Sequence, residues 1–170
     1  MGFILRMITG SRWYDLDDDS WVPSGDIHGD PLSDFRTREN VLSVWFIEND
    51  KSNLERVAAA YATSRGKLDQ IDFVLLPDNL LPPDIQMKAV AAKTCDKIAN
   101  ECWHRDLVQL TGQRIVALAR QFYREGYKKE EMGRYDHSYI ATLIKQGIER
   151  SEIDPKRLSA TLRTDIESVA

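Results

Sequence analysis

Two short apolar runs enclose one helical stripe in the middle of the chain. The runs, residues 41–48 and 71–76, are rich in β-branched and aromatic residues, which is typical of strands buried on at least one face. Between them, over residues 52–65, apolar side chains recur at helical spacing: Leu54, Val57, Ala58, Tyr61 and Ala62. Ser52 and Glu55 fit a capping box, and Gly66 fits a helix stop. The pattern predicts a strand, a helix and a strand that form the core.

The same reasoning predicts elements on both sides of this unit. A first strand is expected over residues 3–9. Beyond the second run, helical spacing predicts helices over residues 84–100, 103–124 and 136–150, and a last one that opens at Asp154-Pro155. Gly112 would lie inside the second of these helices and suggests close packing there, while residues 128–134 are expected to form a charged loop. Strands come first and helices follow, an order that favours an α+β fold.

The expected architecture is a small sheet packed by C-terminal helices. The sheet would contain the N-terminal strands and the central strand-helix-strand unit. We expect one α+β domain over residues 1–170, with a strand-rich part over 1–83 and a helical part over 84–170. Residues 11–40 carry aromatic residues, acids and frequent turn residues, so they are expected to form extended segments and turns.

Composition narrows the class of protein. No apolar run approaches the roughly 18 residues of a membrane span, so no membrane contact is expected. Cys95 and Cys102 are expected on one helix as packing residues, which suits a reducing, cytoplasmic location. The net charge is −4, and residues 1–50 hold 4 Lys and Arg against 10 Asp and Glu. This acidic N-terminal part would repel a phosphate backbone, so nucleic acid is an unfavoured partner.

One string resembles a known family motif. Gly25-Asp-Ile-His-Gly29 resembles the first metal-binding motif of calcineurin-like metallophosphoesterases, in which the Asp and the His ligate a two-metal centre. By that resemblance Asp26 and His28 would be metal ligands. The later motifs of that family and its further histidines are absent from this chain, because only His104 and His137 remain. The sequence therefore predicts no metal site and no cofactor.

Two other acidic patterns occur in the same region. Asp15, Asp17 and Asp19 occupy the first positions of a calcium loop, but the glycine that such a loop needs is replaced by Ser20 and no helices flank it. A second set lies within eleven residues of an irregular segment and could form a general acid/base site: Asp26, His28, Asp30, Asp34 and Arg36. The alternative is that these residues serve turns and local ion pairs.

Aromatic residues without a core period suggest a binding surface. Tyr and Trp are enriched at interface cores, and five of them stand outside the apolar runs: Trp13, Trp21, Tyr127, Tyr135 and Tyr139. No phosphate-binding glycine loop, nucleophile elbow or paired-cysteine motif is present.

Three functions remain open. We expect a non-enzymatic accessory or regulatory protein of the immunity or antitoxin kind, which binds another protein or forms a homodimer. The first alternative is a small hydrolase, dependent on a metal or on acid/base chemistry, that uses residues 26–36. The second is a DNA-binding regulator that uses the C-terminal helices, with Lys156, Arg157 and Arg163.

Overall fold

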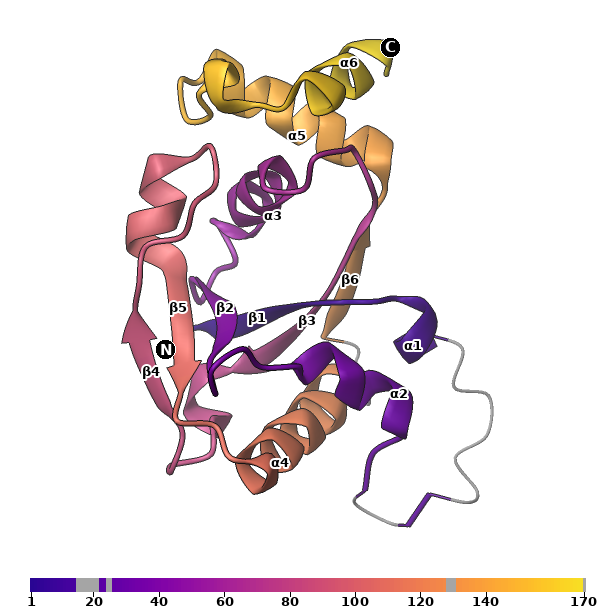
Figure 1. Ribbon diagram of the computed structural model, residues 1–170, viewed down its shortest axis with the longest axis vertical. Helices are drawn as coiled ribbons and strands as arrows, with labels where there is room; N and C mark the ends of the chain where they lie inside the picture. The colour runs from indigo at the N-terminus through magenta and orange to yellow at the C-terminus, as the bar shows by residue number, and fades with distance from the viewer. Residues whose placement is uncertain (15–21, 24–25, 128–130, 170) are drawn as a thin grey trace.

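The chain forms one six-stranded antiparallel sheet between two layers of helices (Figure 1). The computed structural model describes residues 1–14, 22–23, 26–127 and 131–169. The strands are β1 (Phe3–Ile8), β2 (Leu42–Ile47), β3 (Ile71–Pro77), β4 (Gln86–Ala89), β5 (His104–Val108) and β6 (Met132–Tyr135). Their spatial order is β4-β5-β2-β1-β3-β6, and every neighbouring pair is antiparallel. The α+β fold predicted from the sequence is confirmed.

Helices cover both faces of the sheet. On one face lie α3 (Leu54–Thr63), α5 (His137–Glu149) and α6 (Ala160–Ser168). The other face carries α1 (Ser11–Tyr14), α2 (Gly29–Leu32) and α4 (Gly112–Phe122), with the short turn η1 (Ser33–Phe35). The remaining short helical segments are η2 (Asp78–Leu80), η3 (Ala99–Trp103), η4 (Tyr123–Tyr127) and η5 (Pro155–Arg157). No helix in the described ranges is long and apolar enough to cross a membrane.

The two layers explain why β3 is apolar from Phe73 to Leu76. Successive side chains of a strand point to opposite faces. In β1, Leu5 joins the core beneath α3 and Ile4 joins the core above α4, and both are fully buried. A strand covered on both faces has no solvent side, so it reads as a continuous apolar run.

The central strand-helix-strand prediction is confirmed, with one added feature. β1 lies between β2 and β3, so α3 connects two strands that are not neighbours in the sheet. Val57 and Ala58 of the predicted stripe are fully buried, while Leu54 and Tyr61 are partly buried. The predicted capping box is wrong: α3 begins after Asn53, whose side chain turns back to bond the backbone of β2 instead.

The helices predicted over residues 84–124 are largely wrong. Residues 86–89 and 104–108 are strands, and only residues 112–122 form the α-helix α4. Thr111 is the N-cap of this helix, because its hydroxyl accepts a hydrogen bond from the Arg114 backbone. Gly112 is the first helical residue, and nothing lies within 4 Å of the Cβ that an alanine would add, so its expected close packing is absent.

Three smaller predictions also change. The charged loop over residues 128–134 contains the start of β6, and residues 128–130 lie outside the described residues. Cys95 is buried as expected, but Cys102 is exposed, and both are free thiols. The α5 cap is confirmed, since the Asp136 carboxylate accepts from the Tyr139 backbone. Asp154 caps only the turn η5, and Ser159 caps α6.

Candidate functional site

The outer strand β4 forms one edge of the sheet and is open to solvent. It pairs with β5 on one side, from Gln86 opposite Val108 to Ala89 opposite Arg105. All four of its residues are exposed. An edge strand presents main-chain N–H and C=O groups on its outer side that another extended chain can pair with. β4 is therefore a geometric candidate for binding an extended segment.

Local contacts hold β4 in place at both ends. Before the strand, Ile85 is buried and its N–H donates to Pro82 O, which closes a turn. After the strand, Nδ1 of His104 lies 2.7 Å from Val90 O. His104 itself packs edge-on against Trp45, with ring centroids 4.9 Å apart. The edge is thus anchored to the core of the sheet.

Exposed apolar side chains gather near this edge. Among the described residues five large hydrophobic side chains are exposed, and three of them flank β4: Met87, Val90 and Ile98. Met87 is in the strand, and Val90 follows it directly. Ile98 directly precedes the π-helix η3, which packs against β4 and β5. An apolar group beside a strand with a free outer edge is typical of an interaction surface.

The charge beside β4 is positive. Lys88, Lys93 and Lys97 are all exposed. Of the nearby acids, Glu101 lies 3.9 Å from Lys97 and Asp106 is opposite Lys88 in β5. We define the β4 edge surface as β4 together with Val90, Lys93, Lys97 and Ile98. Its lysines favour an acidic ligand, although a lysine on an edge strand also guards against aggregation.

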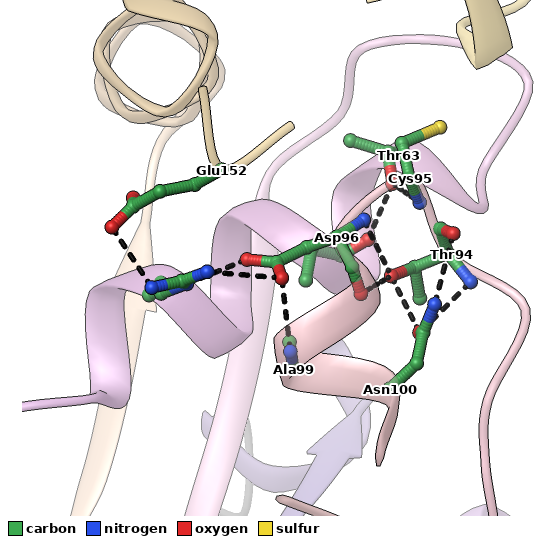
Figure 2. Close-up of polar contacts among 9 residues, drawn as sticks. Thr63, Thr94, Cys95, Asp96, Ala99, Asn100 and Glu152 are labelled. Carbon is green, nitrogen blue, oxygen red and sulfur yellow. Dashed lines mark hydrogen bonds and ion pairs between the residues drawn. The ribbon is translucent and has the colours of Figure 1, made fainter. Parts of the chain in front are cut away.

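A buried polar network fixes the segment that follows β4 (Figure 2). Asp96 is fully buried and accepts two hydrogen bonds from Arg56 of α3, at 2.6 and 3.1 Å, and one from the backbone of Ala99. Asn100 bonds the backbone and hydroxyl of Thr94. Glu152 accepts from the other side of Arg56, at 2.9 Å. The hydrogen bond to Asp96 raises the pKa of the Arg56 guanidinium, despite its partial burial. The network therefore ties the β4 edge surface to α3.

The aromatic residues proposed from the sequence have different surroundings. Trp13 is fully buried and donates its indole N–H to Asp34 at 2.9 Å. The Tyr135 ring makes tilted contacts with the rings of Phe73 and Tyr139, with centroids 5.3 and 5.1 Å apart. Tyr139 is 39% exposed, and its hydroxyl bonds Glu55. Trp21 and the side chain of Tyr127 lie outside the described residues.

The proposed acid/base residues have separate partners. Asp26 bonds Arg120 of α4 at 2.9 Å, and this bond lowers the pKa of the Asp26 carboxyl. His28 is buried beside the ring of Tyr123. Asp34 is buried and receives bonds from four donors around the start of α1: Thr9 N, Thr9 Oγ1, Arg12 Nη1 and Trp13 Nε1. Asp30 and Arg36 are exposed.

Few contacts among the described residues support the metal and nucleic-acid hypotheses. Within the described ranges no three His, Cys, Asp or Glu side chains come together to hold a metal ion. The acidic run at Asp15, Asp17 and Asp19 lies outside them. Of the C-terminal basic residues, Arg163 bonds Pro155 O, while Lys156 and Arg157 lie exposed on η5.

The residues of the β4 edge surface were not identified from the sequence. They fall in the region where helical spacing predicted a helix. The exposure of this strand follows from its position at the end of the sheet, which depends on the order of all six strands.

Comparison with known proteins gives no match: no family model, no curated protein and no solved structure is similar to this chain.

Proposed function

We propose that this protein is a non-enzymatic accessory or regulatory protein that acts by binding another protein at the β4 edge surface. The observation that carries the proposal is the coincidence of an unpaired sheet edge with Met87, Val90 and Ile98, three exposed large hydrophobic residues. An extended peptide that adds to such an edge gains main-chain hydrogen bonds, and its side chains meet the apolar residues. The proposed occupant is an extended, acidic segment of a partner protein, which Lys88, Lys93 and Lys97 complement in charge.

Tyr135 and Tyr139 remain the competing binding surface. They belong to the opposite edge of the sheet, next to β6. Their rings are in tilted contact, and the Tyr139 hydroxyl bonds Glu55. These local contacts satisfy the polar ends of the aromatic pair, whereas the apolar residues near β4 have no polar end to satisfy. The β4 edge surface is therefore the stronger candidate.

Site-specific photocrosslinking tests the proposal directly. A photoreactive side chain at position 87 should capture one partner in the native host, and the same group at Gln113, an exposed position of α4, should not. With the purified partner, Met87→Asp should weaken binding by at least about tenfold, equivalent to 1.4 kcal/mol. Tyr139→Ala is the matched control at the other edge and should leave the affinity unchanged.

Three results would overturn the proposal. Equal capture at positions 87 and 113 would remove the β4 edge surface as the site. A loss of affinity in Tyr139→Ala with none in Met87→Asp would move the interface to the opposite edge. A concentration-dependent dimer that Met87→Asp dissociates would replace the partner protein with a second copy of this chain.

A further inference from the structure

A cavity of about 210 Å³ opens on the α3 side of the sheet, where β1 and β2 separate. The pairing of these strands runs from Phe3 opposite Ile47 to Leu5 opposite Trp45 and then ends. The segment that follows β4 and the C-terminal end of α3 complete the walls. The cavity is smaller than the roughly 300–1,000 Å³ of drug-sized sites, so its size suits a small molecule.

Arg6 lies where the two strands part. Its Nη1 donates to Ser43 O at 2.7 Å, and its Nε and Nη2 donate to Asp34 O at 3.0 and 2.6 Å. The two acceptors of these three bonds are uncharged main-chain carbonyls. A guanidinium has five N–H groups, so one N–H on each Nη nitrogen has no acceptor in these contacts. Two N–H groups on neighbouring nitrogens are what a carboxylate needs for bidentate binding.

The positive charge of Arg6 is only partly compensated by its surroundings. The carboxylate that acts on its charge belongs to Asp34, whose oxygens bond Thr9, Arg12 and Trp13. Burial lowers the pKa of the Arg6 guanidinium, while the charges of Tyr61 and Asp34 act in the opposite direction. A bound anion would offset this cost of burial.

A second cation lines the same cavity. Lys93 is exposed at its rim, and the described residues of the lining include no carboxylate. Asp106 is close by and accepts from Ser43 at 3.1 Å, so one negative charge stands beside the wall. Arg6 and Lys93 together still leave the cavity positive.

Three rings form part of the wall. Trp45, Tyr61 and His104 line the cavity, and Trp45 and His104 meet edge to face. The contact of His104 Nδ1 with Val90 O fixes the orientation of its ring. These surfaces favour an apolar or aromatic body next to the charged end.

We propose that this cavity binds a small organic acid, with its carboxylate on Arg6 and Lys93 and its apolar part on Trp45 and Tyr61. The site shares Lys93 with the β4 edge surface but does not depend on a protein docking there. It is a ligand site in addition to the proposed function, and its test uses small molecules and the full chain alone.

A titration of the full chain with benzoate tests the site. Binding is measured by calorimetry and by the shifts of backbone amide resonances. Saturable binding should shift the resonances of Ser64, Ala92 and Thr94. Benzamide has the same shape without the charge and should bind at least about tenfold more weakly if a charge-assisted bidentate contact is made. Equal binding of the two compounds, or no saturation by benzoate, would overturn the proposal.

Variants locate the binding to the cavity. Ala92→Phe would fill the cavity and should abolish benzoate binding without changing the charge. Lys93→Met should weaken binding by about fivefold or more, while Lys97→Met, an exposed lysine of the same segment, should have less than a twofold effect. Benzoate binding that survives Ala92→Phe, or that Lys93→Met and Lys97→Met reduce equally, would show that the acid binds elsewhere. Arg6→Met should abolish binding in a chain whose amide spectrum stays dispersed, and retained affinity would contradict the assigned contact.

Discussion

The indole N–H of Trp13 donates a hydrogen bond to Asp34 Oδ2 at 2.9 Å, and both side chains are buried. The same carboxylate also accepts from the backbone and hydroxyl of Thr9 and from Arg12. Asp34 thus joins the end of β1, α1 and η1, and its lone pairs are used by the fold. A carboxylate saturated in this way is poorly placed to move protons in catalysis.

Asp34→Ala should destabilise the protein strongly. The substitution leaves the Trp13 indole and the Thr9 N–H without their acceptor, at about 1–3 kcal/mol for each buried donor. A total loss of roughly 2–5 kcal/mol is expected in urea unfolding. Asp30→Ala, at an exposed position of α2, is the control and should stay within about 0.5 kcal/mol of the unmodified protein. If Asp34→Ala were equally stable, the carboxylate would have a role other than structure.

A side chain at Gly133 should destabilise the protein. A Cβ at this position of β6 would lie 2.2 Å from the ring of Phe73, which faces it across the β3–β6 pair. Gly133→Ala should therefore lower the melting temperature, with a loss of about 1–3 kcal/mol from overpacking. Gly112→Ala is the matched control, because nothing lies within 4 Å of its added Cβ. That variant should be neutral or slightly stabilised, and equal effects of the two would argue against the β3–β6 packing.

Tyr135 should make the stability fall at alkaline pH. Burial, with the nearby charges of Glu55 and Tyr139, raises the pKa of Tyr135 to about 12 from 10.0. Between pH 10 and 12 the unfolded chain then releases this proton and the folded chain keeps it, so the unfolded state binds fewer protons and stability falls as the pH rises. Urea midpoints at pH 9 and 11.5 measure the effect. Tyr135→Phe should reduce the decline, and an unchanged decline would show that other groups cause it.

The sequence predicted the strands and helices that have a clear local periodicity of apolar residues. An apolar pattern was enough to predict the strands near residues 3–9, 41–48 and 71–76. Helix α5 was predicted from its apolar period and its cap, Asp136. β5 was missed because its partner β2 lies about sixty residues away. Its polar residues find partners across the sheet, as in the bond from Ser43 to Asp106. Val90 and Ile98, which fall within the helix predicted over residues 84–100, are exposed.

The candidate sites were harder to predict for the same reason. Trp13 lacks a core period in the sequence, and its burial depends on Asp34, twenty-one residues further along the chain. The cavity at Arg6 forms only where β1 and β2 diverge, which the residues of either strand alone do not indicate. The order of strands in a sheet and the point where two strands diverge are tertiary features. Local sequence patterns therefore do not predict them.

The ion pair between Arg56 and Asp96 should be essential to the segment that carries the β4 edge surface. Asp96 is fully buried, and Arg56 reaches it from α3 with two hydrogen bonds. Asp96→Ala leaves a partly buried guanidinium without its main partner, and breaking such a pair costs about 3–5 kcal/mol. Hydrogen exchange should locate the loosening at residues 94–103, since the Ala99 amide loses its acceptor.

Lys97→Ala is the control. It removes the neighbouring charge, whose contact with Glu101 is exposed and 3.9 Å long, and it should change the stability by less than about 1 kcal/mol. Faster exchange spread evenly over the whole chain would mean that Asp96 supports global stability only, without a particular hold on the segment beside β4.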